Sequence, residues 1–282
     1  MSRDWPEYRV SRSGRGFDIS EKEKTVSRIR NAFNDHKAFI AFITAGDPDI
    51  PTTKKAVIEA VRNGADLIEI GIPFSDPTAE GPVIMEADRR ALEGGVTTDD
   101  IFRMTRELRE EIAVPLVYMT YANVVFSYGM ETFAAKAREA GIDGVILPDV
   151  PFEEKEEFDE VFADEGIDLI SMIAPTSGER ISQIAREAKG FIYMVSSLGV
   201  TGTRTDITTD IGKMTEIVRA NTDIPCAVGF GISTPEQAEK MAKVSDGAIV
   251  GSAIIKILAQ YGKEAPEHIG AYVKEMAEAV HR

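Results

Sequence analysis

Residues 67–84 read LIEIGIPFSDPTAEGPVI, and this stretch organises the rest of the chain. Its first six residues form an apolar run that contains a single glutamate. Such a run is typical of a parallel strand covered on both faces. Pro73 and Pro77 then prevent the strand from continuing, because proline cannot donate a ladder hydrogen bond. The stretch therefore predicts a buried parallel strand followed by a stiff loop.

The same stretch carries two carboxylates, Glu69 inside the strand and Glu80 in the loop. Burial strips water from Glu69 and raises its pKa toward the range that is useful in acid–base chemistry. Two carboxylates on one strand-and-loop unit therefore indicate a proton-transfer pair. The alternative is structural, with Glu69 as an ion-pair partner and Glu80 as a solvated loop residue, since perturbed carboxylates mark functional sites only statistically.

Short apolar runs alternate with amphipathic stretches of helical length along the chain. This alternation implies an α/β fold with a parallel sheet and right-handed crossovers, and eight units in about 250 residues favour a (β/α)8 TIM barrel over an open doubly wound sheet. The predicted strands are 38–44, 66–72, 115–120, 144–147, 168–173, 190–195, 224–228 and 247–250. The predicted helices are 21–34, 52–63, 83–93, 98–111, 130–140, 153–165, 179–188, 211–221, 235–244 and 253–259.

The domain organisation follows from the same alternation, which no linker interrupts. We expect a single domain over residues 21–282, with an extra N-terminal helix and an inserted helix after the second strand. Residues 1–20 are polar and lack an apolar period, so they are expected to form a flexible arm. A weak repeat, Gly-x-Asp at 64–66, 141–143 and 166–168, marks the approach to three strands, with glycine suited to a left-handed helix end.

Composition excludes several classes of function. The net charge of −15 argues against nucleic acid or an anionic membrane as the partner, because both are polyanions. The single cysteine, Cys226, excludes an internal disulfide, and the N-terminus lacks a signal sequence, so we expect a cytoplasmic protein. His36, His268 and His281 lie far apart and lack ligand spacing, which argues against a zinc site.

The last two strand ends predict a phosphate site. TIM barrels carry their active sites at the C-terminal ends of the strands and often bind phosphate after strands seven and eight. The seventh strand ends in Gly229-Phe230-Gly231, and Gly251-Ser252 follows the eighth directly before a helical run. Glycines let backbone N–H groups approach an anion, and a helix N-terminus favours negative charge. The alternative is that these glycines only make tight turns.

The loop after the sixth strand, residues 196–206, consists of small and polar residues, including Gly199, Thr201 and Gly202. This composition suits a mobile lid, which would exclude water from the site and strengthen the electrostatics around Glu69 and Glu80. An ordinary surface loop is the alternative.

Taken together, the motifs resemble the tryptophan synthase alpha subunit family over about residues 38–259. The match lies in the order and spacing of many short motifs rather than in any one of them. These motifs are TAGDP at 44–48, ExGxPFSDP at 69–77, GP at 81–82, YAN at 121–123, PDVP at 148–151, GVTG at 199–202, GFG at 229–231 and GS at 251–252.

The resemblance implies a carbon–carbon lyase that cleaves indole-3-glycerol phosphate to indole and glyceraldehyde 3-phosphate in tryptophan biosynthesis, without a metal or cofactor of its own. It also implies roles for particular residues. Glu69 would act as the acid/base residue and Tyr193 would pack beside it. Glu80 would hold the indole N–H and stabilise the positive charge that develops as C3 is protonated. The implied indole slot comprises Phe42, Met119, Tyr121 and Ile173. The implied phosphate site comprises Gly202, Phe230, Gly231, Gly251 and Ser252, with Thr201 reaching Glu80 from the lid.

The resemblance further implies a beta subunit that carries pyridoxal phosphate, in an αββα complex, facing the loops near Asp76-Pro77 and residues 123–126. Simple solvent exposure of these loops is the alternative. One departure from the family pattern is Glu80, since aspartate is common there. Three other functions remain open: a weakly catalytic regulatory partner of a beta subunit, a stand-alone lyase, and another phosphate-binding barrel such as a sugar-phosphate isomerase.

Overall fold

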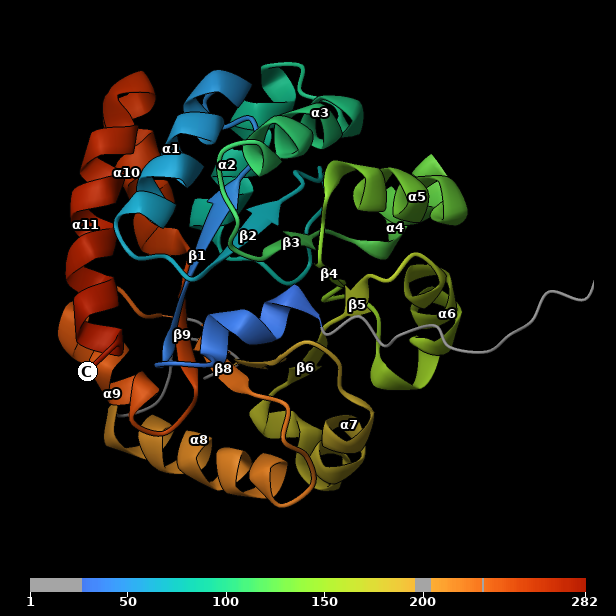
Figure 1. Ribbon diagram of the computed structural model, residues 1–282, viewed down its shortest axis with the longest axis vertical. Helices are drawn as coiled ribbons and strands as arrows, with labels where there is room; N and C mark the ends of the chain where they lie inside the picture. Colours follow the sequence, from blue (N-terminus) through green and yellow to red (C-terminus); the bar gives the residue numbers. More distant parts are fainter. Residues whose placement is uncertain (1–26, 196–203, 230) are drawn as a thin grey trace, which may run out of the picture.

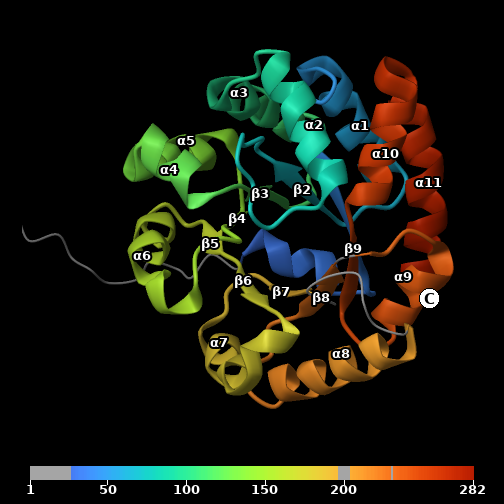
Figure 2. The same cartoon turned by 180° about the vertical axis from the view of Figure 1, so that it is seen from behind.

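The structure, a computed structural model, describes residues 27–195, 204–229 and 231–282. Its strands form one parallel sheet in the order β5-β4-β3-β2-β1-β9-β8-β7-β6, which curls into a nearly closed barrel with helices outside it (Figures 1 and 2). The predicted TIM barrel is confirmed. The strands are β1 (Ala38–Thr44), β2 (Leu67–Gly71), β3 (Leu116–Met119), β4 (Gly144–Ile146), β5 (Asp168–Leu169), β6 (Ser171–Ile173), β7 (Ile192–Val195), β8 (Cys226–Gly229) and β9 (Gly247–Val250).

Nine strand segments are described rather than the eight predicted, because the predicted strand 168–173 is divided at Ile170. The first part, β5, pairs with β4, whereas the second part, β6, pairs with β7. The two ends of the sheet therefore meet within one short stretch of chain. The division changes the strand count but not the barrel.

The helices alternate with the strands and cover the outside of the barrel (Figure 1). No helix in the described ranges combines the length and apolar character that a bilayer crossing requires. The α-helices are α1 (Ile50–Arg62), α2 (Pro82–Glu93), α3 (Thr98–Arg109), α4 (Ala122–Tyr128), α5 (Met130–Ala140), α6 (Glu156–Asp164), α7 (Ile181–Glu187), α8 (Arg204–Arg219), α9 (Pro235–Ala242), α10 (Ser252–Tyr261) and α11 (Ala265–Val280). The 3-10 helices are η1 (Arg28–Phe33), η2 (Phe152–Glu154), η3 (Pro175–Arg180) and η4 (Gly262–Glu264).

The inserted helix after the second strand is confirmed, since both α2 and α3 lie between β2 and β3. Thr97 caps α3: its side chain accepts the N–H of Asp100, and the Asp100 carboxylate accepts the N–H of Thr97. This reciprocal pair satisfies two N–H groups that a helix start leaves free.

Four helical details differ from the prediction. The described part of predicted helix 21–34 is the 3-10 helix η1, and α8 begins at Arg204, so residues 204–206 are helical rather than part of a loop. Helix α4 is absent from the predicted helices because seven residues are too few to show a period. Helix α11 is also absent from them, although Ile269, Val273 and Met276 are fully buried on one of its faces.

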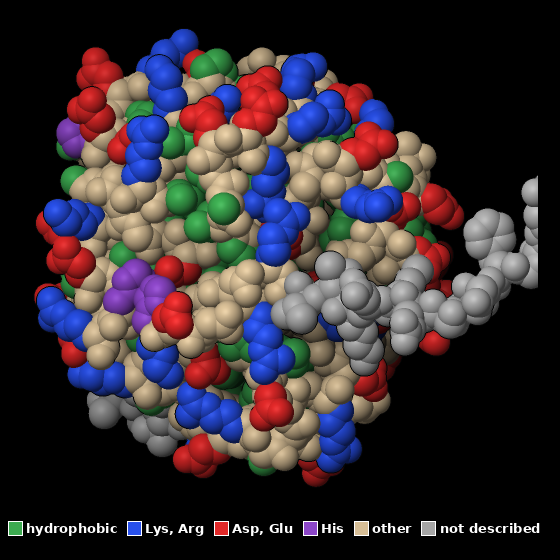
Figure 3. Space-filling view, in the orientation of Figure 1, with side chains coloured by type: hydrophobic (Ala, Val, Ile, Leu, Met, Phe, Trp, Pro, Cys, Tyr) green, Lys and Arg blue, Asp and Glu red, His purple; other side chains and the backbone are tan. Residues whose placement is uncertain are grey.

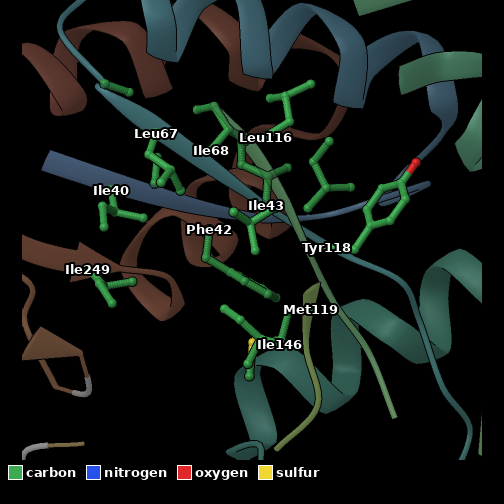
Figure 4. Close-up of a cluster of buried hydrophobic side chains, with 14 of the residues drawn as sticks. Ile40, Phe42, Ile43, Leu67, Ile68, Leu116, Tyr118, Met119, Ile146 and Ile249 are labelled. Carbon is green, nitrogen blue, oxygen red and sulfur yellow. The ribbon is translucent and has the colours of Figure 1, made fainter. Parts of the chain in front are cut away.

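Side chains alternate between the inside and the outside of the barrel along each strand. On β3, Tyr118 turns outward and its hydroxyl lies 2.7 Å from Thr105 Oγ1 of α3. The next residue, Met119, lies on the other side, beside Phe42 of β1 (Figure 4). This alternation decides which residues can reach the mouth of the barrel.

Candidate active site

A pocket of about 240 Å³ opens at the C-terminal ends of the strands. It contains eight residues of the predicted site, together with residues that the prediction lacks. The predicted residues in its lining are Phe42, Glu69, Glu80, Met119, Tyr193, Gly231, Gly251 and Ser252, and the additional ones include Ala79, Ile84, Ile232, Ser233, Ile249 and Lys256.

Glu69 lies in the middle of β2, paired in register with Phe42 on one side and Val117 on the other. Its side chain is fully buried, and neither carboxylate oxygen has a hydrogen-bond partner among the described residues. Burial raises the pKa of Glu69 to about 8. Glu69 is therefore a neutral acid at pH 7, and its proton faces the pocket rather than a structural cation. The ion-pair alternative for Glu69 finds no cation in the described structure.

Glu80 lies in the loop before α2, and its Oε2 is buried without a partner in the described part of the chain. Burial, opposed by a hydrogen bond with Tyr121 and assisted by the charge of Asp149, raises the pKa of Glu80 to about 6. Glu80 is thus mostly ionised at pH 7. The Tyr121 hydroxyl also accepts the N–H of Ala79 at 3.0 Å, so it anchors the loop that carries Glu80.

A third carboxyl group, Asp88 of α2, lies close to Glu80 and is absent from the predicted site. Burial and the nearby charge of Glu80 raise the pKa of Asp88 to about 8, opposed by a hydrogen bond from the Phe74 backbone. The sequence does hold a signal for this residue, because Asp88 lies between Ala87 and Ala91 on the buried face of α2. An acid on an apolar helix face is unusual without a partner.

Two aromatic residues are accommodated by glycines on neighbouring strands. A Cβ on Gly71 would lie 2.6 Å from Phe42 Cζ, and a Cβ on Gly229 would overlap the hydroxyl of Tyr193. Only glycine therefore lets both rings keep their positions beside Glu69. Burial, with the charge of Glu69, raises the pKa of Tyr193 well above its ordinary value, so its hydroxyl stays protonated.

The structure does not bring Ile173 to this pocket. Ile173 is fully buried in a separate apolar cluster with Ile181 and Ile184 of α7, outside the barrel. Met172 is paired in register with Tyr193 and packs against the main core, so it is the inward-facing residue of β6. A shift of one residue along a strand moves a side chain to the opposite face, and a motif does not resolve that shift.

At the phosphate end, Gly231 has a φ of +76°, and Ser252 begins α10 directly after Gly251. Lys256, one helical turn after Ser252, is the one cation among the described residues of the lining. The sequence motifs predict a phosphate site built from backbone N–H groups and do not include Lys256, whose i,i+4 spacing from Ser252 is the available signal. Thr201, Gly202 and Phe230 lie outside the described residues.

The comparison with known proteins agrees with this geometry. The sequence model of the tryptophan synthase alpha chain family matches residues 29–281. The chain belongs to this family. It is 44% identical over 255 residues to the tryptophan synthase alpha chain of Lacticaseibacillus casei, covering 90% of this chain and 96% of that one.

Solved structures agree with the family assignment. The tryptophan synthase subunit alpha of Legionella pneumophila is similar, with a TM-score of 0.82, 36% identity and coverage of 91% of this chain and 99% of that one. A chain of the tryptophan synthase a2b2 complex from Pyrococcus furiosus is also similar, with a TM-score of 0.79 and 35% identity, and the match covers 86% of this chain and 99% of that one. The tryptophan synthase alpha chain is a lyase that cleaves indole-3-glycerol phosphate, and this chain is such an alpha subunit.

Proposed function

We propose that Glu69 carries the proton transfers of indole-3-glycerol phosphate cleavage. The observation that supports this role is its complete burial in the lining of the pocket, with neither oxygen partnered by a residue that the structure describes. A group with a pKa of about 8 retains its proton near neutrality and can donate it to carbon.

Glu69 transfers a proton twice in the reaction, once as an acid and once as a base. Glu69 first gives its proton to C3 of the indole, which makes C3 tetrahedral. The bond from C3 to the glycerol chain then breaks, and its electron pair returns to the indole ring. The adjacent glycerol hydroxyl becomes the aldehyde carbonyl, and its proton passes to the Glu69 carboxylate. Glu69 therefore ends protonated, as it began, and the net reaction needs no metal.

Glu80 complements this cycle by remaining ionised. Its pKa of about 6 keeps a negative charge at the pocket wall at neutral pH. There it accepts the indole N–H and stabilises the positive charge that develops as C3 is protonated. Tyr121, placed behind Glu80, holds the longer glutamate side chain in position where the family commonly has aspartate.

Substrate contacts divide along the pocket. Phe42, Met119 and Tyr193 form the wall against the indole. Gly231, Gly251 and Ser252 hold the phosphate through backbone N–H groups and the start of α10, and Lys256 adds a positive charge. From the sequence motifs, Gly202 and Phe230 complete the phosphate site, and Thr201 reaches Glu80 from a lid over the pocket.

The family and the a2b2 complex of Pyrococcus furiosus support assembly with a beta subunit, in an αββα arrangement. The beta subunit would carry pyridoxal phosphate and condense the released indole with serine, in the cytoplasm. Phe126 of α4 is 49% exposed, which suits a surface at the third loop that a partner would cover, and the Asp76-Pro77 loop would face the same partner. Residues 1–20 would form an arm outside the single domain of residues 21–282.

The test is indole release by the purified chain, alone and with a beta subunit. Glu69→Gln is expected to lower the rate of cleavage by about 10²–10⁴-fold, because the amide cannot transfer a proton. Its stimulation of the beta reaction is expected to stay within about twofold of the parent chain. Glu86→Gln, an exposed glutamate on α2, is the matched control and should cleave normally.

The outcomes of this test distinguish the alternative functions. Normal cleavage by Glu69→Gln would refute the acid/base assignment. Fast release by the parent chain that ignores the beta subunit would favour a stand-alone lyase, and stimulation of a beta subunit without any release would favour a regulatory partner.

A further inference from the structure

Two of the three histidines meet at the opposite end of the barrel from the active site. His36 precedes β1, Asp66 precedes β2, and His281 follows α11, so the three residues come from distant parts of the sequence. Figure 3 shows histidine side chains gathered beside an acidic side chain on this face. The fold therefore creates a cluster that sequence spacing alone argues against.

In this cluster both histidines contact the carboxylate of Asp66. His36 Nε2 lies 3.0 Å from Asp66 Oδ1, and His281 Nε2 lies 2.8 Å from Asp66 Oδ2. One ligand atom from each residue lies within 4.8 Å of the other two. The two imidazole rings meet edge to face with centroids 4.0 Å apart. Both Nε2 atoms are thus turned toward one carboxylate.

A backbone hydrogen bond fixes Asp66, and the two histidine side chains are partly exposed to solvent. The Phe39 backbone N–H donates to Asp66 Oδ2 at 2.7 Å, which fixes the carboxylate at the start of the sheet. Asp66 is 15% exposed, whereas the side chains of His36 and His281 are 36% and 28% exposed. A hollow of about 710 Å³ borders both histidines, so an ion and its water molecules can reach them.

Two of the nearby cations, Lys37 and Arg219, are engaged elsewhere. Lys37 Nζ donates to the Ser245 carbonyl at 2.6 Å and lies 3.5 Å from Asp246. Arg219 likewise contacts Asp246, at 2.9 Å. Both ion pairs described for Asp66 are with histidines.

We propose that His36, Asp66 and His281 form a binding site for a zinc-like divalent transition ion that ties the end of α11 to the starts of β1 and β2. Two imidazole nitrogens and one carboxylate oxygen are ligands that Zn²⁺ prefers, with water as the fourth. Tetrahedral zinc separates its ligand atoms by about 3.3 Å, so small side-chain rotations from the present arrangement complete the site. Mg²⁺ is disfavoured because it prefers oxygen ligands.

The experiment titrates the full-length, untagged chain with Zn²⁺ by calorimetry and measures its melting temperature with and without the ion. We expect one zinc ion per chain and a rise in melting temperature of about 5 °C at saturation, because binding to the folded state stabilises it. Mg²⁺ should give neither response.

Three variants make the assignment specific. His36→Asn and His281→Asn should each weaken zinc binding by more than about 100-fold, because a lost ligand exceeds the effect of a lost outer-shell partner. His268→Asn removes the third histidine, which stacks on Tyr261 away from the cluster, and should bind zinc normally.

The proposal is overturned if the parent chain shows no zinc-dependent melting shift, or if His268→Asn loses binding as much as the other two variants. Equal stability losses in His36→Asn with and without zinc would also overturn it, since that result identifies only hydrogen bonds. Cleavage of indole-3-glycerol phosphate is a separate readout, expected to be unchanged in all three variants.

Discussion

The two ends of the barrel hold the same kind of side chain in opposite circumstances. At the N-terminal ends of the strands, Asp66, Asp143 and Asp246 each accept a backbone N–H and contact at least one cationic or histidine side chain. At the C-terminal ends, Glu69 and Glu80 keep buried oxygens without partners in the described structure. Satisfied carboxylates hold strands together, whereas unsatisfied ones reduce stability and leave reactive groups free.

The largest effect expected from this comparison is on stability, at Asp143. Its carboxylate accepts the Leu116 N–H at 2.9 Å, pairs with Arg28 at 2.8 Å and contacts Arg109, whose side chain is 12% exposed. Asp143→Ala leaves Arg109 without its counter-ion, so the free energy of unfolding should fall by about 3–5 kcal/mol. Urea unfolding followed by circular dichroism measures this loss.

Two further variants test the reason for that loss. Asp143→Asn keeps an acceptor for the Leu116 N–H but removes the charge. Its free energy of unfolding should therefore lie between those of Asp143→Ala and the parent chain. Glu110→Ala removes an exposed carboxylate and should change stability by less than about 0.5 kcal/mol. An Asp143→Ala chain as stable as the Glu110→Ala control would contradict the comparison.

At Glu69, by contrast, replacing the carboxyl group is expected to increase the free energy of unfolding. Its folded-state pKa of about 8 lies above the ordinary 4.5, so its stabilising contribution is complete below pH 4.5 and is lost as pH rises toward 8. Glu69→Met, which has a similar volume, should raise the free energy of unfolding by about 3 kcal/mol at pH 7.5 while abolishing cleavage.

Urea unfolding at pH 5 and pH 8 checks the cause. The difference between Glu69→Met and the parent chain should be larger at pH 8, where retaining the proton is most unfavourable. Glu86→Met replaces a glutamate whose side chain is 58% exposed and should show no such pH dependence. A difference that is the same at both pH values would exclude desolvation of Glu69 as its origin.

Much of the fold can be predicted from sequence because its signals are local. Apolar runs and turn residues give the strands, and capping at Thr97 marks the start of α3. The Gly-x-Asp repeat locates aspartates at three strand starts but not their bonds. Asp66 and Asp143 accept backbone N–H groups, whereas Oδ2 of Asp168 has no hydrogen-bond partner among the described residues. Those bonds depend on strands that are far apart in sequence.

The candidate site divides in the same way. Glu69 and Glu80 can be identified from the sequence because they lie in a stretch that carries the family motifs. The desolvation of Glu69 follows from the apolar run that surrounds it. The face of Ile173, the proximity of Asp88 to Glu80 and the meeting of His36 with His281 are set by register and by closure of the barrel. No local pattern in the sequence encodes these three arrangements.

The smallest effect expected is on the pH dependence of cleavage, and it compares the two ends directly. Glu80 must be ionised, so kcat/KM should fall about tenfold per unit as pH drops below about 6. Glu69 must be protonated, so kcat/KM should fall equally as pH rises above about 8. Glu80→Gln should lose the acid limb at a lower overall rate and keep the alkaline one. Asp143→Asn should keep both limbs, since its carboxylate lies at the other end of the barrel. An acid limb that persists in Glu80→Gln would assign that ionisation to a group other than Glu80.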